Sequence, residues 1–489
     1  MAIRLSAATL SDLPATVTAP GYDRSVLTPG IVHFGVGNFH RAHQAMYLDT
    51  LFATGRDHDW ALVGAGVFAG EAQGRAVLEG QDWLYTLVEQ EAGRSAARVI
   101  GSYAGFVPPA DGPAIVAQLA DPAIRIVSLT ITEGGYFLDS NDAFDAAHPA
   151  IVADAAAPDA PKTVFGLMLQ GLRARRDAGI APFTVMCCDN IPHNGAVTRR
   201  TLTGLARLSD PAFADWVEGN VAFPNSMVDR ITPATGERER EILRTEFGVE
   251  DGWPVFCEDF TQWVLEDAFP LGRPALEDVG VQFVPDVAPY ELMKLRILNG
   301  GHAAIAYPGG LMDVHFVHEA MEHPRIRAFL RKLEETEIIP NVPPVPDTDT
   351  AAYFDTIEAR FSNPKIGDTI RRLCLDGSNR QPKFILPTLR DALKAGGSVT
   401  GLALESALWC RYCAGTTDSG AEIAPNDPNW DALQAVAIEA KARPRAWLEQ
   451  RAIYGDLADA APFAEAFGHW LRLLWADGTE ATLDAYLAG

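Results

Sequence analysis

The sequence predicts two domains: an α/β N-terminal domain built on a largely parallel sheet, and a mainly α-helical C-terminal domain. Three observations lead to this prediction. With 489 residues, the chain is longer than one hydrophobic core usually serves. Its first half alternates apolar strand-like runs with helical patterns, whereas helical periodicity prevails from about residue 285 onward. We therefore expect residues 1–284 to form the first domain and residues 285–489 the second.

Four short apolar runs are the expected strands of the first domain. They cover residues 31–34, 61–67, 124–132 and 183–188. Between the last two, residues 164–178 carry apolar side chains at helical spacing. Alternation of this kind predicts a parallel sheet covered by helices, and such sheets bind ligands at the carboxyl ends of their strands.

The second domain is expected to be helical because four segments show helical spacing of apolar residues. These are ELMKLRILNGGHAAIAY, HEAMEHPRIRAFLRKLEETE, TAAYFDTIEARF and LESALWCRYCAG. The Pro-rich segment 340–346 has helices on both sides, so we expect it to be a stiff surface connection inside this domain.

Composition and charge exclude several classes of protein. Hydrophobic residues make up 48% and charged residues 21%, as in ordinary globular proteins. The net charge of −24 repels phosphate backbones and anionic membranes, so no nucleic-acid or membrane partner is expected. The N-terminal segment lacks the apolar core of a signal peptide, no apolar run is long enough to span a bilayer, and six cysteines do not form a disulfide scaffold. We expect a cytoplasmic protein with free thiols; the sequence does not disclose its oligomeric state, and a monomer is compatible with it.

A pair of glycines follows the first expected strand, in Gly35-Val36-Gly37. In a dinucleotide-binding fold the first glycine permits a tight turn, and the second lets the backbone approach the pyrophosphate at a helix N-terminus. The expected cofactor-binding residues here are Phe34, Gly35, Val36, Gly37, Asn38 and Phe39.

The third position of this turn motif holds His40, not glycine, so the pattern by itself is also compatible with a plain tight turn. His40 and His43 lack a carboxylate or cysteine in register, which favours a helix face over a metal site.

The choice of cofactor is expected to depend on the residues after the second strand, where an acid would bind the ribose hydroxyls and basic residues a 2′-phosphate. Glu71 comes first there, Arg75 follows, and no basic cluster is present, which favours NAD over NADP. The alternative is that both are solvated surface charges.

The segment from Lys294 to His302, KLRILNGGH, contains the strongest catalytic candidates. At about 100° per residue, an undistorted α-helix would put Asn299 and His302 about 140° and 80° around the axis from Lys294, so all three would lie within one arc and could face a single cleft. Gly300 and Gly301 cost helix stability, so they suggest a bend or a close approach.

Alcohol oxidation explains why these residue types belong together. A lysine acts as the base if burial lowers its pKa from about 10.4 toward about 7, and an asparagine amide stabilises the oxyanion by donating a hydrogen bond. The alternative is a lysine at a helix edge, a capping asparagine and a core histidine.

Two further polar residues are candidates for the same chemistry. Asn190 follows the strand at 183–188, where ligands are expected, although a turn asparagine is the simpler interpretation. Asp229 precedes a proline-terminated turn, where it could instead pair with the neighbourhood of Arg230 or cap that turn.

Taken together, these segments resemble the long-chain mannitol dehydrogenase family over nearly the full chain. The matching segments are IVHFGVGNFHRAHQ from residue 31, QDWLYTLVE from Gln81, TITEGGY from Thr130, CCDNIPHNG from Cys187, MVDRITP from Met227 and KLRILNGGH from Lys294. The resemblance implies a Rossmann-type N-terminal domain, a mostly helical C-terminal domain, and a cleft between them where NAD meets an open-chain polyol or its ketose.

The resemblance also implies residue roles. The lysine that matches Lys294 is the family's general base, the asparagines that match Asn190 and Asn299 hold the reacting oxygen, and the histidine that matches His302 positions the substrate. His40 belongs to the family's own version of the glycine motif, whereas Glu71 is not placed on the family's ribose-binding acid.

Three other residues stay open after this comparison. Asp229 matches a polar site residue of less clear role. Glu291, three residues before Lys294, would tune or relay the base, or else is an exposed helical carboxylate. Arg372 is a substrate-binding candidate, for which Arg380 and Lys383 compete.

The implied reaction is the metal-independent interconversion of D-mannitol and D-fructose with NAD. Within the family, arabinitol, sorbitol, fructuronate and tagaturonate are alternative substrates. A zinc enzyme would need a set of metal ligands, and Cys410 and Cys413 form the only C-x-x-C, so no metal is expected. A non-catalytic NAD-binding protein is the third alternative.

Overall fold

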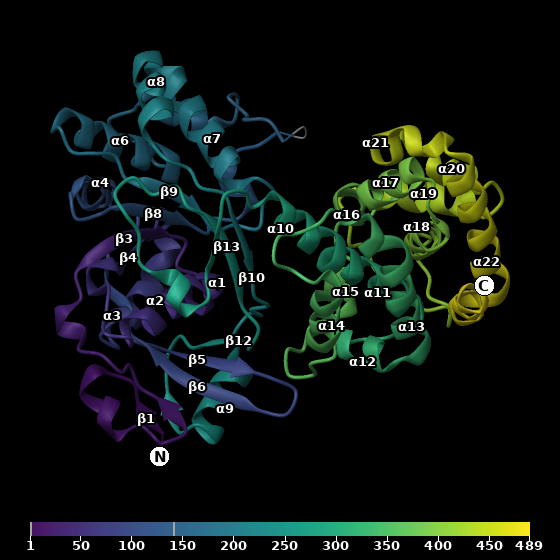
Figure 1. The fold of residues 1–489 in the computed structure, drawn as a ribbon, viewed down its shortest axis with the longest axis horizontal. Helices are drawn as coiled ribbons and strands as arrows, with labels where there is room; N and C mark the ends of the chain where they lie inside the picture. The colour runs from purple at the N-terminus through teal and green to yellow at the C-terminus, as the bar shows by residue number, and fades with distance from the viewer. Residues whose placement is uncertain (1, 140–141) are drawn as a thin grey trace. The chain divides into compact units, whose positions relative to one another are not determined.

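The computed structural model describes residues 2–139 and 142–489, and the chain divides into two compact units, Met1–Ala288 and Pro289–Gly489. Figure 1 shows α/β layers in the first unit and helices in the second.

The main sheet of the first unit contains five parallel strands in the order β7-β4-β3-β8-β9. The strands are β3 (Pro29–Phe34), β4 (Ala61–Ala65), β7 (Tyr103–Phe106), β8 (Ile126–Leu129) and β9 (Thr184–Cys187). The chain builds outward from β3 to β4 and β7, then returns to the other side of β3 for β8 and β9. The strand order therefore reverses between β3 and β8, where a sheet of this kind opens a ligand crevice.

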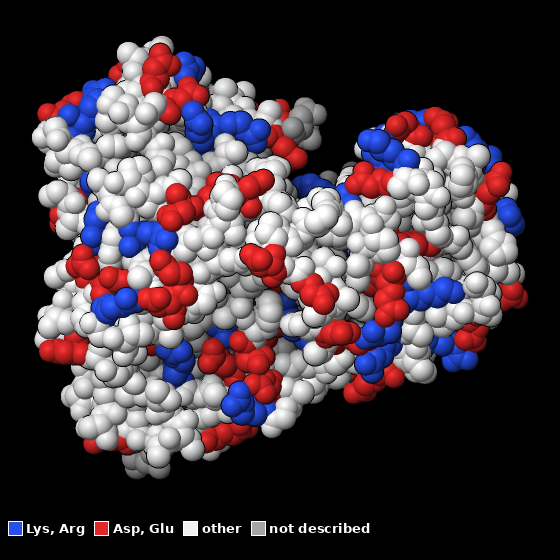
Figure 2. All heavy atoms as spheres, viewed as in Figure 1, with Lys and Arg blue, Asp and Glu red and all other residues white. Residues whose placement is uncertain are grey.

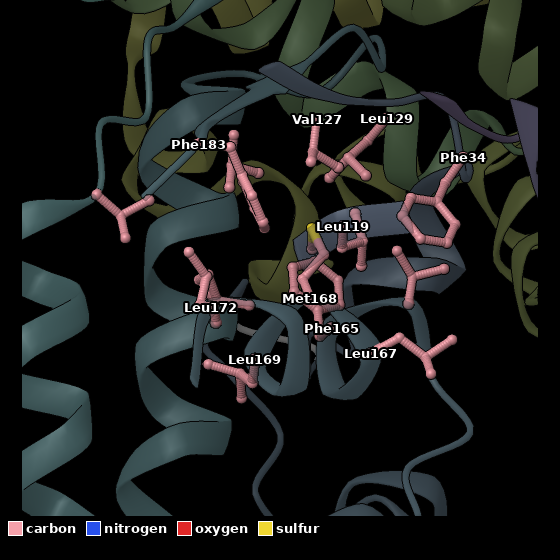
Figure 3. Packing of buried hydrophobic residues seen from close by; sticks show 14 of the residues in the cluster. Phe34, Leu119, Val127, Leu129, Phe165, Leu167, Met168, Leu169, Leu172 and Phe183 are labelled. Atoms are coloured by element: carbon pink, nitrogen blue, oxygen red, sulfur yellow. The ribbon is translucent and has the colours of Figure 1, made fainter. Parts of the chain in front are cut away.

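Both faces of this sheet are buried, because alternate residues of β3, β4, β8 and β9 enter different hydrophobic clusters. One cluster contains Val32, Val63, Val127 and Val185, and the other contains Ile31, Leu62, Ile126 and Met186. Figure 3 shows the first cluster, in which Phe165, Met168 and Leu172 of α6 (Val164–Asp177) lie near Val127 and Leu129 of β8.

Helices cover the two faces of the sheet. The first cluster includes residues of α4 (Gly112–Ala120), α6 and α7 (Asn194–Ser209), and the second includes residues of α2 (Gln44–Phe52). The other helices of this unit are α1 (Asn38–Ala42), α3 (Ala72–Glu79), α5 (Pro149–Ala156), α8 (Pro211–Asn220) and α9 (Glu237–Glu246).

Arg175 is a charged side chain buried in the layer formed by α6. Its Nη1 donates to Leu119 O, Asp121 O and Ile124 O at 2.9–3.1 Å, and its Nε donates to Ala181 O at 2.7 Å. The guanidinium thus satisfies carbonyls where α4 ends and β8 begins. Burial lowers the pKa of Arg175, but its five-donor fork fits this set of acceptors.

We expect Arg175→Leu to lower the free energy of unfolding by about 3 kcal/mol, because buried carbonyls would lose their donors. Urea denaturation followed by circular dichroism measures this change. Arg176→Leu is the control, since Arg176 lies next in α6 and pairs near the surface with Asp177. A loss below about 1 kcal/mol for Arg175→Leu would contradict the assigned role.

Three smaller sheets, which the sequence analysis did not predict, complete the first unit. Their strand orders are β12-β5-β6-β2, β10-β13-β14 and β1-β11. The strands are β1 (Ile3–Arg4), β2 (Val17–Thr18), β5 (Tyr85–Gln90), β6 (Ser95–Ile100), β10 (Ser226–Asp229), β11 (Val249–Glu250), β12 (Val255–Glu258), β13 (Gln262–Glu266) and β14 (Gln282–Val284).

The second unit is built from helices around α18 (Thr400–Cys413), whose residues from Gly401 to Cys413 are all buried. The others are α10 (Ala288–Met293), α11 (Gly300–Leu311), α12 (Val317–Glu322), α13 (Pro324–Leu333), α14 (Thr350–Phe361), α15 (Ile370–Leu373), α16 (Gly377–Phe384), α17 (Leu386–Ala395), α19 (Trp430–Ala440), α20 (Arg445–Leu448), α21 (Arg451–Tyr454) and α22 (Ala461–Ala488). Gly478, with φ of 82°, kinks α22, and Asp418 accepts a hydrogen bond from the following amide of Thr479 at 2.7 Å.

Charged side chains of both signs mix over the face shown in Figure 2. Many arginines pair with carboxylates, as Arg443 does with Glu439 and Glu449, both at 2.7 Å. All six cysteines are buried and free. Within residues 2–139 and 142–489, no helix combines the length and apolar character needed to cross a membrane.

Candidate functional site

The glycine turn joins β3 to α1, and glycine is favoured at its two positions for different structural reasons. Gly35 has φ of 91°, and a Cβ there would lie 2.0 Å from Thr130 O, so a larger residue is excluded on both counts. Gly37 precedes α1 as its N-cap, and apart from its chain neighbours the atom nearest to a Cβ there would be Gly35 O, at 3.8 Å. The space above Gly37 is therefore open, as close approach of a ligand to the backbone requires.

The side chains around the turn differ in what they contact. Phe34 is buried in the core and the Phe39 ring stacks on His43, with centroids 5.0 Å apart. Asn38 accepts a hydrogen bond from Arg41 at 2.8 Å. Of the seven residues predicted to bind the cofactor, Val36 of the turn and Glu71 line the cavity beside the turn.

This cavity measures about 380 Å³ and lies next to the turn. Its charged lining residues are Glu71 and Arg240, its aromatic ones Phe106 and Trp253, and Gln73 is a further polar one. Glu71 follows β4, and its Oε2 accepts a hydrogen bond from the Phe68 amide at 2.8 Å, while burial raises the pKa of its carboxyl group. Arg75 does not line the cavity; it pairs with Glu79 and donates to Phe106 O at 2.8 Å.

Arg240 and Trp253 were missed by the sequence analysis. The Arg41 guanidinium lies 3.9 Å from the centroid of the Trp253 ring and also donates to Trp253 O. Arg41 thus ties the wall of the cavity to α1. No local motif marks Arg240 or Trp253, because they come from segments far along the chain from the glycine turn.

Lys294 begins a π-helix, η7 (Lys294–Asn299), that connects α10 to α11. The expectation of an α-helix through these residues is therefore wrong. In a π-helix the hydrogen bonds join residues five apart, so Asn299 lies about one turn along the helix from Lys294. In an α-helix it would instead lie about 140° around the axis from Lys294. Insertions of this kind are frequent at functional sites.

Lys294 and Asn299 are shielded from solvent to different degrees. Lys294 is 7% exposed, so it does not extend from a helix edge. Asn299 is partly buried, and its Oδ1 is a buried atom without a hydrogen-bond partner among the described residues. Glu291 on α10 is 8% exposed, so the alternative of an exposed carboxylate is wrong for this residue.

Gly301 allows a second π-helix, η8 (Glu334–Ile338), to approach α11. A Cβ on Gly301 would lie 3.2 Å from Glu334 Oε1 and 3.5 Å from Phe361. The ring of the next residue, His302, stacks on Phe361 with centroids 4.2 Å apart. Of the two explanations for the glycine pair, the close approach applies at Gly301.

Glu334 is a fully buried carboxyl group that the sequence analysis did not single out. Neither of its oxygens has a hydrogen-bond partner in the part of the chain that the structure describes, and burial raises its pKa well above the usual range. The available signal was a glutamate within the apolar spacing of the segment FLRKLEETE.

Arg372 and its two rivals differ in their partners. Arg372 lies in α15, where Asp368 accepts hydrogen bonds from both its Nε and Nη2 and raises its pKa. Arg380 donates to Leu373 O at 3.1 Å, and Lys383 is exposed. An anionic ligand at Arg372 would therefore compete with Asp368.

The remaining candidates, Asn190 and Asp229, belong to the first unit. Asn190 is exposed just after β9, at the carboxyl edge of the main sheet, as the sequence predicted. Its neighbour Asp189 anchors this loop by accepting hydrogen bonds from the Ile131 and Thr132 amides at 2.8 and 3.0 Å. Asp229 ends β10 and is 6% exposed, in a different sheet from β9.

No group of three or more His, Cys, Asp or Glu among the described residues could hold a metal ion. Cys410 and Cys413 are buried in α18.

The strand order, the glycine turn and the cavity beyond β4 define a Rossmann-type dinucleotide-binding protein with a second, helical domain. Family models agree: residues 29–278 match the mannitol dehydrogenase Rossmann domain, and residues 286–475 match the mannitol dehydrogenase C-terminal domain. The chain belongs to the mannitol dehydrogenase family. The predicted family and fold class are both confirmed.

Individual relatives are similar over nearly their whole length. The chain is 60% identical to a mannitol 2-dehydrogenase of Cereibacter sphaeroides, covering 97% of this chain and 99% of that protein. A solved Pseudomonas fluorescens mannitol 2-dehydrogenase, in ternary complex with NAD and D-mannitol, is 43% identical with a TM-score of 0.87, covering 99% and 100% of the two chains. A solved substrate-free D-sorbitol dehydrogenase is 36% identical with a TM-score of 0.92, covering 98% and 100%.

Proposed function

We propose that this protein interconverts D-mannitol and D-fructose by hydride transfer to or from NAD, with Lys294 as the general base. The observation that carries the reaction is the 60% identity, over 97% of the chain, to a mannitol 2-dehydrogenase. The complex of the Pseudomonas fluorescens relative with NAD and D-mannitol supports the same cofactor and substrate.

The first unit has the features that NAD requires. The open backbone at Gly37 and the start of α1 would receive the pyrophosphate, and Glu71 beside Val36 would bind the adenosine ribose. Bound NAD supplies the hydride acceptor. The carboxylate of Glu71 would disfavour a 2′-phosphate and so NADP.

At the reacting alcohol, Lys294 removes the hydroxyl proton. Asn299, about one π-helical turn away, donates its amide hydrogen to the developing alkoxide, and Asn190 is the second proposed donor. His302, whose ring is held on Phe361, orients the substrate. Asp229 is proposed to belong to the catalytic group, and Arg372 is proposed to bind the substrate.

A substrate panel tests the reaction. D-mannitol, D-sorbitol, arabinitol, D-fructose, fructuronate and tagaturonate are assayed with NAD or NADP, or with their reduced forms, through NADH or NADPH absorbance. We expect D-mannitol and D-fructose with NAD to have the highest kcat/KM. NADH binding without turnover of any compound would favour a non-catalytic protein, and a preference for the keto-uronates would make the chain a hexuronate reductase.

D-sorbitol is the second candidate substrate, because the D-sorbitol dehydrogenase structure superimposes with a TM-score of 0.92. The ratio of kcat/KM for D-mannitol and D-sorbitol in the same panel decides between the two.

Metal independence is tested by prolonged dialysis against a strong chelator. We expect full activity afterwards, since Lys294 performs the proton transfer. Loss of activity that zinc restores would overturn the lysine mechanism.

The two glycines of the turn make a matched pair of variants. We expect Gly35→Ala to weaken NADH binding at least about 10-fold and to lower Tm, because the new Cβ collides with Thr130 O. Gly37→Ala causes no such collision, so we expect Tm to be retained. We expect it to weaken NADH binding, because the new methyl group would occupy the space through which the cofactor approaches the backbone. Cofactor fluorescence gives Kd and calorimetry gives Tm; unchanged Kd in both variants would remove the turn from the cofactor site.

A further inference from the structure

Five buried or partly buried polar side chains lie directly beneath the glycine turn. His33 Nδ1 is 2.8 Å from Ser128 Oγ, and His33 Nε2 is 2.9 Å from Thr130 Oγ1. Thr130 Oγ1 is in turn 2.7 Å from Gly35 O. At the other end, Gln44 Oε1 is 2.9 Å from Ser128 Oγ. The ring of His40 stacks on His33 with centroids 3.3 Å apart.

We propose that these side chains form a one-directional hydrogen-bond chain, from His40 through Gln44, Ser128, His33 and Thr130 to Gly35 O, which positions the cofactor-binding turn. The proposal rests on the proposed function in that the turn binds NAD. It assigns positioning roles to residues inside the sheet and in α1 and α2.

The direction of the chain follows from the donors available. Gly35 O cannot donate, so two oxygens 2.7 Å apart require the Thr130 hydroxyl to donate to it. Thr130 must then accept from His33 Nε2. With His33 neutral, Nδ1 carries no proton, and Ser128 must donate to it.

His33 is neutral because it is fully buried and no carboxylate is among its hydrogen-bond partners in the described structure. Burial lowers its pKa to about 3. The single proton of Ser128 is thus committed to His33, and Gln44 must present its NH₂ group to Ser128, which a half-turn of the amide achieves.

The same half-turn gives partners to two of three unsatisfied atoms. Without it, Gln44 Nε2 and both ring nitrogens of His40 are buried without hydrogen-bond partners among the described residues. The turned amide donates from Nε2 to Ser128 and presents its oxygen to the His40 ring, which interacts with the Gln44 side chain, so that one ring N–H of His40 gains an acceptor. Because buried polar groups are nearly always bonded, this agreement supports the direction of the chain.

The hydrogen-bond chain also gives His40 a role at the third position of the glycine motif. The His40 ring covers His33, where a glycine would leave a gap, and a ring N–H of His40 is the first donor of the hydrogen-bond chain. As a result, Gly35 O accepts hydrogen bonds from the Thr130 hydroxyl and from the Gly37 amide, both at 2.7 Å. A turn fixed before the cofactor arrives loses less conformational entropy on binding.

The tautomer of His33 tests the chain directly. In protein labelled with ¹⁵N-histidine, with the resonance assigned by comparison with His33→Gln, we expect a neutral ring with its proton on Nε2 at neutral pH. A proton on Nδ1, or a charged ring, would overturn the proposal whatever the activity.

The effect on the cofactor is tested with two buried serines. Ser128→Ala interrupts the chain, whereas Ser102→Ala removes a hydroxyl that is equally buried but donates to Ala45 O at 2.8 Å. We expect both to lower Tm, and Ser128→Ala alone to raise the Kd of NADH, by about 5-fold, with the polyol KM unchanged. Equal NADH affinity in the two variants would overturn the positioning role. Wild-type protein that binds no NADH would instead contradict the proposed function.

Discussion

Replacing Lys294 with alanine is expected to lower the turnover of D-mannitol at least about 100-fold, while the affinity for NADH is unchanged. General-base catalysis contributes factors of this size, and Lys294 is the buried base candidate at the start of the π-helix. Steady-state kinetics in both directions gives kcat and KM, and cofactor fluorescence gives Kd.

Two further variants separate the base from its charge. Lys294→Arg retains a positive charge but cannot lose its proton at ordinary pH, so we expect it to be as inactive as the alanine variant. Lys394→Ala removes an exposed lysine of α17 and is expected to leave turnover unchanged. Near-normal turnover in Lys294→Ala would remove this residue from the role.

The pH dependence of the wild-type enzyme has a defined sign. Oxidation needs the neutral lysine, so kcat/KM for D-mannitol should fall as the pH drops below the pKa of Lys294. Reduction of D-fructose needs the protonated form, and its rate should fall as the pH rises through the same pKa. Oxidation that is independent of pH between about 6 and 10 would exclude a lysine base.

Asn299→Ala is expected to lower turnover about 100-fold, with the KM for D-mannitol changed much less. The amide donates to charge that develops in the transition state, so its loss raises the barrier more than it weakens the ground-state complex. The π-helix brings this amide about one turn from Lys294, which an α-helix of the same sequence would not do.

Asn299→Asp is the sharper variant for this role. It keeps the size of the side chain but replaces the donor with an acceptor that repels an alkoxide, so we expect turnover no higher than in Asn299→Ala. A change confined to KM in either variant would mean that Asn299 only positions the substrate.

The core strands of the main sheet were predictable because their signals are local. Apolar runs gave β3, β4, β8 and β9, although 61–67 and 124–132 were expected longer than Ala61–Ala65 and Ile126–Leu129. The hairpin of β5 and β6 was missed, because its residues mix polar and apolar types and its pairing partners β2 and β12 lie far away in sequence.

The residues of the candidate site also fall into those that the sequence pattern singled out and those whose roles came from the family resemblance. Residue type and spacing were enough to single out Gly35, Gly37 and Lys294, since a glycine pair after a strand and a lysine in an apolar helix are visible in the sequence. The resemblance to a family then supplied roles for Asn190, Asn299 and His302. These roles await the mutational tests above.

By itself, then, the sequence determined the α/β and helical halves, the family and the residues to test, because hydrophobic periodicity and short motifs depend on neighbouring residues. Only the tertiary structure decided that η7 is a π-helix, that Glu291 and Glu334 are buried, and that Arg240 and Trp253 line the cavity next to Glu71. The physical reason is that helix winding and burial depend on packing against distant segments, which local propensity does not encode.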